Sequence, residues 1–278
     1  MKRIARIDPG RLALVSRHLA WRLTHRPPVL REPIFMVGCP RSGTGVSVHL
    51  FGTHPWVAHW TEATRTWDPR GFDDPEADHH RTAEDVTERE RRRLHAWFEW
   101  FRQTRGKPRF ANKNPRSSVR IDFIRAVFPD AYYIHVIRDG RAVVSSLLQR
   151  MEREPWRKEV PFGDFCKPPD WRRHVRSDPA EQAALQWREI VRHVRDRRFV
   201  LGERYVEYKY EDLCEDPRAV LGATFRAVGL PAEDEHMTEI PARLTNMNDR
   251  SIDLLTPAQV ETIEAVERDL LAELGYRP

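Results

Sequence analysis

The hydrophobic positions along the chain fall into short continuous runs that alternate with stretches of helical periodicity. Runs such as IFMVG (34–38) and AYYIHVI (131–137) are typical of strands buried on both faces of a parallel sheet. Between such runs, apolar residues recur at helical intervals, as Phe123, Ile124 and Val127 do. This alternation predicts an α/β domain with a mostly parallel central sheet flanked by helices.

Local signals predict where two of the helices begin. Asp139, which follows the run 131–137, is expected to be the N-cap of a helix. Thr256 is expected to cap the last helix, with Pro257 at the first helical position and Gln259 completing a capping box.

Two segments, 65–108 and 150–180, do not fit the alternation and are rich in Trp, Arg, Asp and Pro. We interpret them as insertions that cover the ligand-binding edge of the sheet; the alternative is that they only pack on the domain. Residues 31–278 are then expected to form a single α/β domain. Residues 1–30 precede it as a basic amphipathic helix.

Composition adds a preference for anionic ligands. The chain has 47 Lys and Arg against 42 Asp and Glu, a formal net charge of +5. Because the two signs are interspersed, this charge does not indicate nucleic-acid binding. The three cysteines form no CxxC pair and are expected to be reduced thiols, which together with the lack of a signal peptide predicts a cytoplasmic protein.

The N-terminal amphipathic stretch offers an alternative location. Leu12, Val15, Leu19 and Leu23 would share one face of a helix that also carries basic residues. Packing of this helix on the domain is the simpler expectation. The alternative is peripheral contact with a membrane, either by an enzyme or by a non-catalytic membrane-surface binding protein.

The loop GCPRSGTG (38–45) lies between the first predicted strand and a helix. Gly38 and Gly43 have the spacing of a phosphate-binding loop, but Thr44 and Gly45 stand where a nucleotide triphosphatase has Lys and Ser or Thr. The free backbone N–H groups and positive dipole at the start of the helix favour an anion. The loop therefore predicts an anion site that differs from an ATP site.

Two further segments are expected near this loop, because parallel strands bring their carboxyl ends to one edge of the sheet. Arg138 ends a strand, and Ser146 lies two turns into the next helix. Alone, these residues are more typical of an ion pair with Asp139 and a solvated serine. Lys113 ends the short run RFAN and could supply the charge that the loop lacks.

Together these segments resemble the sulfotransferases that use 3′-phosphoadenosine 5′-phosphosulfate (PAPS), and within them the tyrosylprotein and bacterial branch. The resemblance covers most of 33–276 and rests on motifs in the family's order: PIFMVGCPRSGTG, HPWVAHWTE, NKNP, FPDAYYIHVIRDGRAVVSS, YKYEDL and LTPAQVETIEAVERDLLAELGY. It implies a P-loop-type three-layer fold. The implied reaction transfers a sulfonate group to a carbohydrate, phenolic, lipid-linked or other small-molecule alcohol, releasing 3′-phosphoadenosine 5′-phosphate (PAP) without a metal.

The resemblance also implies roles for individual residues. Lys113 would contact the oxygen that bridges sulfur and phosphorus. Arg138 and Ser146 would hold the 3′-phosphate, and Tyr210 would contact the adenine. The loop residues that would hold the 5′-phosphosulfate are Pro40, Arg41, Ser42, Gly43, Thr44 and Gly45.

The reaction needs a base for the acceptor hydroxyl, and a buried carboxylate with a raised pKa can serve. The resemblance places Glu62 in this role, with His59 as the alternative base. The competing interpretation of Glu62 is an ion pair with a neighbouring arginine.

The sequence departs from the family in two places. Gly45 stands where a second threonine is common, which removes one hydroxyl from the phosphate loop. Arg243 and Arg250 are both candidates for the basic residue that reaches the 3′-phosphate from the C-terminal loop.

The main rival is a P-loop nucleotide kinase or hydrolase. The absent lysine after Gly43 and the lack of a convincing metal-binding aspartate argue against it. His79 and His80 beside Asp78 are interpreted as part of a solvated loop rather than a metal site. The sequence makes no prediction of oligomeric state.

Overall fold

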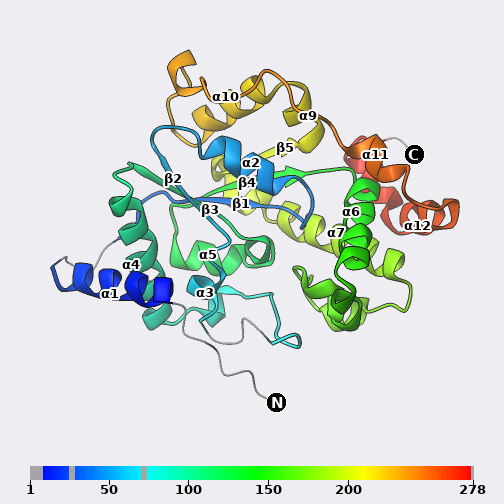
Figure 1. Cartoon of the computed structure of the whole chain (residues 1–278), viewed down its shortest axis with the longest axis horizontal. Helices are drawn as coiled ribbons and strands as arrows, with labels where there is room; N and C mark the ends of the chain where they lie inside the picture. The colour runs from blue at the N-terminus through cyan, green and yellow to red at the C-terminus, as the bar shows by residue number, and fades with distance from the viewer. Residues whose placement is uncertain (1–8, 25–28, 70–73, 277–278) are drawn as a thin grey trace.

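A five-stranded parallel sheet forms the centre of the molecule in the computed structural model, which describes residues 9–24, 29–69 and 74–276 (Figure 1). The strand order is β2-β3-β1-β4-β5, and each strand pairs in parallel with its neighbours. The strands are β1 (Ile34–Val37), β2 (Val57–Thr61), β3 (Arg109–Lys113), β4 (Tyr132–Ile137) and β5 (Tyr205–Lys209).

The central strand β1 is buried on both faces, as its continuous apolar run predicts. Ile34 and Met36 pack into one core cluster, whereas Phe35 and Val37 pack into another on the opposite face. Because alternate side chains point to opposite faces, this short run joins the two halves of the core.

Helices cover both faces of the sheet (Figure 1). One face is packed by α2 (Thr44–Phe51), α9 (Tyr210–Glu215) and α10 (Pro217–Ala227). The other carries α3 (Thr64–Trp67), α4 (Glu88–Thr104), α5 (Ile121–Val127) and α8 (Arg198–Leu201). A third cluster joins α6 (Gly140–Arg153), α7 (Pro179–Arg195) and α12 (Pro257–Glu273), and α11 (Asn248–Ile252) lies against α6.

Both predicted helix starts are confirmed. The Asp139 carboxylate accepts a hydrogen bond from the backbone N–H of Arg141 at 2.9 Å and caps α6. Thr256 and Gln259 form the reciprocal capping box of α12, with Pro257 in its first turn. These local signals succeed because each cap satisfies N–H groups that the helix itself leaves unpaired.

The two predicted insertions differ in their positions. In 65–108, Leu94 and Phe98 of α4 are fully buried against the sheet core, and none of the described residues of this segment, 65–69 and 74–108, lines the cavity described below. For these residues the expectation that the segment covers the ligand edge is corrected: the apolar stripe of α4 packs on a face of the sheet. Segment 150–180 does reach the ligand edge, through Arg153 and Phe165.

The N-terminal helix α1 (Pro9–Thr24) lies against α4. The His18 ring stacks on Trp97 with ring centroids 3.8 Å apart, and Trp21 donates a hydrogen bond to Gln103. Leu19 and Leu23 stay exposed, and the Leu12 side chain lies outside the described residues. None of the described helices has the length and apolar character that crossing a bilayer requires. Peripheral membrane contact stays a prediction.

Candidate active site

A cavity of about 800 Å³ opens at the carboxyl end of β1, the strand that pairs with β3 on one side and β4 on the other. The loop residues assigned to the donor line it, except for Ser42, which is buried beneath the surface. The other predicted site residues in its wall are Glu62, Lys113, Arg138, Ser146, Tyr210 and Arg250. The fold thus brings together residues from six separate segments of the chain.

The phosphate loop is held in shape by contacts beneath it. The Ser118 hydroxyl accepts a hydrogen bond from the Gly38 N–H and donates one to the Gly38 carbonyl, both at 2.9 Å. Gly43 has a left-handed φ of 85°, and a Cβ there would lie 2.3 Å from the Tyr210 ring. The Ser42 hydroxyl is buried and has no partner among the described residues, so the loop retains an unused polar group.

Gly45, by contrast, has room for a side chain. A Cβ built at this position meets nothing within 4 Å, and the residue sits at the cavity wall in the first turn of α2. The missing hydroxyl therefore does not reflect a lack of space.

We expect the Gly45→Thr variant to bind PAP more tightly, by about 2- to 10-fold, because it restores one hydroxyl donor beside the 5′-phosphate. Calorimetric titration of PAP measures this change. The Gly45→Ala variant adds a Cβ without a hydroxyl and controls for the backbone effect of replacing glycine. Equal PAP affinity in the two variants would contradict the assignment of Gly45 to the phosphate loop.

Arg41 connects the loop to α6. Its backbone adopts a left-handed φ of 74°, and its Nε donates a hydrogen bond to the Ser146 hydroxyl at 2.9 Å. Burial lowers the pKa of Arg41 below its ordinary value, and the like charges of Arg150, Arg138, Arg153 and Arg157 act in the same direction. Cations gathered in this way favour a polyanionic ligand.

Arg138 is buried at the end of β4 and points toward the loop. Its guanidinium donates hydrogen bonds to the Asn248 side chain at 2.8 Å, the Arg41 carbonyl at 3.1 Å and the Ser251 hydroxyl at 3.3 Å. It also lies 4.7 Å from the centroid of the Tyr210 ring. No ion pair of Arg138 is found among the described residues, and the surface pair with Asp139 is absent there because Asp139 pairs with Arg141. A cation held only by neutral groups keeps its charge available for a ligand.

Glu62 and Lys113 face each other across the ends of neighbouring strands β2 and β3. The Lys113 ammonium lies 2.7 Å from a Glu62 carboxylate oxygen, and the Glu62 N–H donates to the Lys113 carbonyl at 2.7 Å. The Glu62 side chain is 55 % exposed, so the expectation of a buried carboxylate is wrong. Glu62 also has a left-handed φ of 53°. Such conformations are costly away from glycine and concentrate at functional sites.

His59 lies outside the cavity wall, although it belongs to the same strand β2. Its ring packs over Gly52 at the end of α2 and beside His49. Burial lowers the pKa of His59, which favours a neutral imidazole, but the ring does not reach the cavity. The geometry therefore favours Glu62 over His59 as a base.

Four polar residues that line the cavity or support it were missed by the sequence analysis. Gln149 and Arg153 follow Ser146 on the same face of α6 and line the cavity, so helical spacing from Ser146 could have found them. Asn248 and Ser251, which hold Arg138, come from a distant helix and carry no local signal. Arg250 lines the cavity, whereas Arg243 is exposed and does not.

The histidine-rich loop has a structural explanation. The buried His79 accepts a hydrogen bond from the backbone N–H of Lys167 at 2.9 Å, and burial lowers the pKa of His79 to about 2. Within the described residues, no three His, Cys, Asp or Glu side chains gather as metal ligands.

The parallel sheet and the phosphate loop at its switch point define a P-loop-type α/β fold. A family model for the sulfotransferase family matches residues 33–234, and the chain therefore belongs to this family. Two solved structures share the fold. The sulfotransferase STF9 from Mycobacterium avium matches 95% of this chain and 82% of its own, with a TM-score of 0.58 and 17% sequence identity. The sulfotransferase domain from the curacin biosynthetic pathway matches 90% of this chain and 99% of its own, with a TM-score of 0.56 and 15% sequence identity.

Curated relatives agree with this placement. The chain is 25% identical to the nodulation protein NoeE of Sinorhizobium fredii over 87% of its own length and 65% of that protein. It is 23% identical to protein-tyrosine sulfotransferase 1 of Danio rerio over 88% of its length and 72% of that protein. The chain thus spans slightly less than two thirds of NoeE.

Proposed function

We propose that this chain transfers a sulfonate group from PAPS to a hydroxyl-bearing acceptor. The observation that carries the proposal is the arrangement around one cavity of a phosphate loop, the cations Arg41, Arg138 and Lys113, and the carboxylate of Glu62. Family membership supports the reaction class. The donor and the individual roles rest on the geometry of these residues.

The residues present fit a donor with two anionic ends. Arg41, with the free N–H groups at the start of α2, would hold the 5′-phosphosulfate, and the unpartnered Ser42 hydroxyl lies in the same loop. Arg138, Ser146 and Arg250 line the same cavity and would hold the 3′-phosphate. Such a wall distinguishes PAPS from ATP, which has no 3′-phosphate.

The chemistry divides between the donor and the chain. Bound PAPS supplies a sulfonate group on a phosphate leaving group, so that the acceptor oxygen bonds to sulfur while the bridging S–O bond breaks. Lys113 would stabilise the charge that develops on the leaving phosphate. Glu62 would accept the proton of the acceptor hydroxyl. These two side chains pair with each other, so donor binding would draw Lys113 from Glu62 and release the carboxylate.

The rival nucleotide kinase or hydrolase gains no support from the site. Lys113 comes from β3 rather than from the loop, and Arg138 and Arg250 would bind a 3′-phosphate, which ATP lacks. Incubation with labelled PAPS and a panel of hydroxylated metabolites tests the proposal. We expect label in at least one alcohol or phenol; transfer of the terminal phosphate from labelled ATP would contradict it.

A further inference from the structure

A second pocket adjoins the donor cavity. Its volume is about 350 Å³, and residues common to both walls make the two spaces adjoin: Pro40, Arg41, Glu62, Pro115 and Phe165. A molecule in this pocket would lie beside the carboxylate that we assign as the base. It is therefore the natural place for the acceptor.

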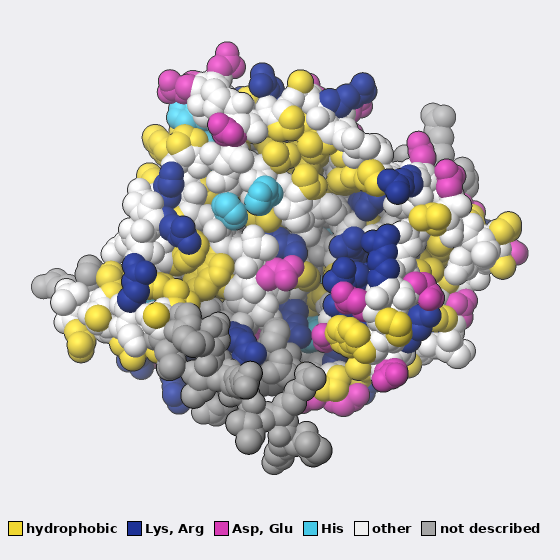
Figure 2. Space-filling model, in the orientation of Figure 1, with side chains coloured by type: hydrophobic (Ala, Val, Ile, Leu, Met, Phe, Trp, Pro, Cys, Tyr) yellow, Lys and Arg dark blue, Asp and Glu magenta, His cyan; other side chains and the backbone are white. Residues whose placement is uncertain are grey.

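The wall of this second pocket is rich in guanidinium groups. Arg41, Arg116, Arg150 and Arg157 line it, against the carboxylates of Glu62 and Asp164. In the space-filling view, Lys and Arg side chains gather beside a hollow next to α6 (Figure 2). The donor accounts for Arg41, but the other three arginines do not line the donor cavity.

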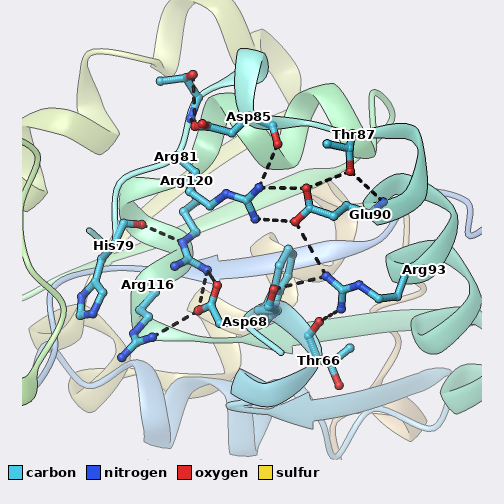
Figure 3. A network of polar contacts seen from close by, with 12 residues as sticks. Thr66, Asp68, His79, Arg81, Asp85, Thr87, Glu90, Arg93, Arg116 and Arg120 are labelled. Atoms are coloured by element: carbon cyan, nitrogen blue, oxygen red, sulfur yellow. Dashed lines mark hydrogen bonds and ion pairs between the residues drawn. The ribbon is translucent and has the colours of Figure 1, made fainter. Parts of the chain in front are cut away.

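Two of these guanidinium groups are held in place by their surroundings. Asp68 lies 3.2 Å from Arg116 and 2.9 Å from the buried Arg120, which fixes the Arg116 side chain at the pocket (Figure 3). Arg157 donates a hydrogen bond to the Gly163 carbonyl at 2.6 Å and stacks 4.7 Å from the Phe165 ring. Cations fixed in this way need little reorganisation to bind an anion.

The remaining arginine is less constrained. Arg150 is half-exposed on α6 and pairs with Glu154 four residues later. The same carboxylate also pairs with Arg157 at 2.5 Å, so one acidic group is shared by two guanidinium groups. This sharing leaves part of the positive charge for a ligand in the pocket.

We infer that the second pocket binds an anionic group of the acceptor, such as a sulfate, phosphate or carboxylate close to the hydroxyl that is modified. This inference rests on the proposed function, because it places the acceptor beside Glu62. It narrows the acceptor from any alcohol to one that carries negative charge. Neutral phenols and simple sugars would lack the interaction.

The test uses the full chain with its donor cavity saturated by PAP, whose binding is measured first by calorimetry. Inorganic sulfate is then titrated while the arginine Nε–H signals are followed by NMR spectroscopy. We expect saturable shifts, and a sulfate affinity about 3- to 10-fold weaker in Arg150→Gln. Acetate in place of sulfate shows whether a carboxylate is also accepted.

Arg92→Gln is the matched control, because the exposed Arg92 also pairs with a glutamate four residues away along its helix, but this pair lies on α4 and outside both pockets. Its sulfate affinity should equal that of the unmodified chain. Non-saturable shifts, or equal affinities in the two variants, would overturn the inference while leaving the donor site intact. Failure of PAP to bind would instead overturn the proposed function, and the inference with it.

Discussion

The Glu62→Gln variant should lose turnover by about 10²- to 10⁴-fold, the usual contribution of a positioned general base. Glutamine keeps the shape of the side chain and can still accept a hydrogen bond from Lys113, which lies 2.7 Å away. The fold and the donor cavity should therefore persist. PAP affinity should stay the same or rise slightly, because a negative charge leaves the cavity wall.

Single-turnover transfer from labelled PAPS, together with calorimetric titration of PAP, measures both quantities. His59→Gln is the control, because His59 lies on the same strand but outside the cavity. Its turnover should be unchanged. If Glu62→Gln kept full turnover, or if His59→Gln alone lost it, Glu62 would not be the base.

The Arg138→Ala variant should bind PAP about 1.5–3 kcal/mol more weakly, the range for hydrogen bonds to charged groups. This corresponds to roughly 10- to 150-fold in the dissociation constant. Adenosine 5′-phosphate, which lacks the 3′-phosphate, should lose little affinity. The ratio of the two affinities is the informative quantity, because Arg138 also holds the Arg41 carbonyl and its loss could loosen the loop for every nucleotide.

Arg243→Ala provides the reference for this comparison, since Arg243 is exposed and does not line the cavity. Its affinities for both nucleotides should match those of the unmodified chain. Equal losses for PAP and adenosine 5′-phosphate in Arg138→Ala would show that Arg138 only supports the loop. The assignment of the 3′-phosphate to this wall would then be wrong.

Much of the fold follows from short-range patterns. The continuous apolar run at β1 predicts that the strand is buried on both faces. The residue types at Asp139 and Thr256 and at the positions that follow them predict the starts of α6 and α12. The position of α4 does not follow in this way. Its apolar stripe, including Leu94 and Phe98, shows that one face is buried but not which surface buries it.

For the site, the sequence predicts only that the carboxyl ends of the strands lie at the same edge of the sheet. Lys113 and Glu62 form an ion pair because β2 and β3 are neighbours, a pairing that neither strand encodes by itself. Arg138 alone was more typical of a surface ion pair. Its burial depends on Asn248 and Ser251, which lie more than a hundred residues further along the chain.

The phosphate loop 38–45 would contact the donor in the proposed reaction. Its backbone, its arginine and its room at Gly45 suit a phosphate, and Lys113 supplies from another strand the charge that an ATP loop carries itself. In the proposed function, Arg138 and Arg250 would add the second anion site. We therefore propose PAPS, rather than ATP, as the donor.

Calorimetric titration of the unmodified chain with PAP and, separately, with ATP and Mg²⁺ tests this claim most directly. We predict that PAP binds more tightly, and that bound PAP prevents the binding of ATP, because both would use the loop that contains Arg41 and Gly43. Tighter binding of ATP with Mg²⁺ than of PAP would contradict the account.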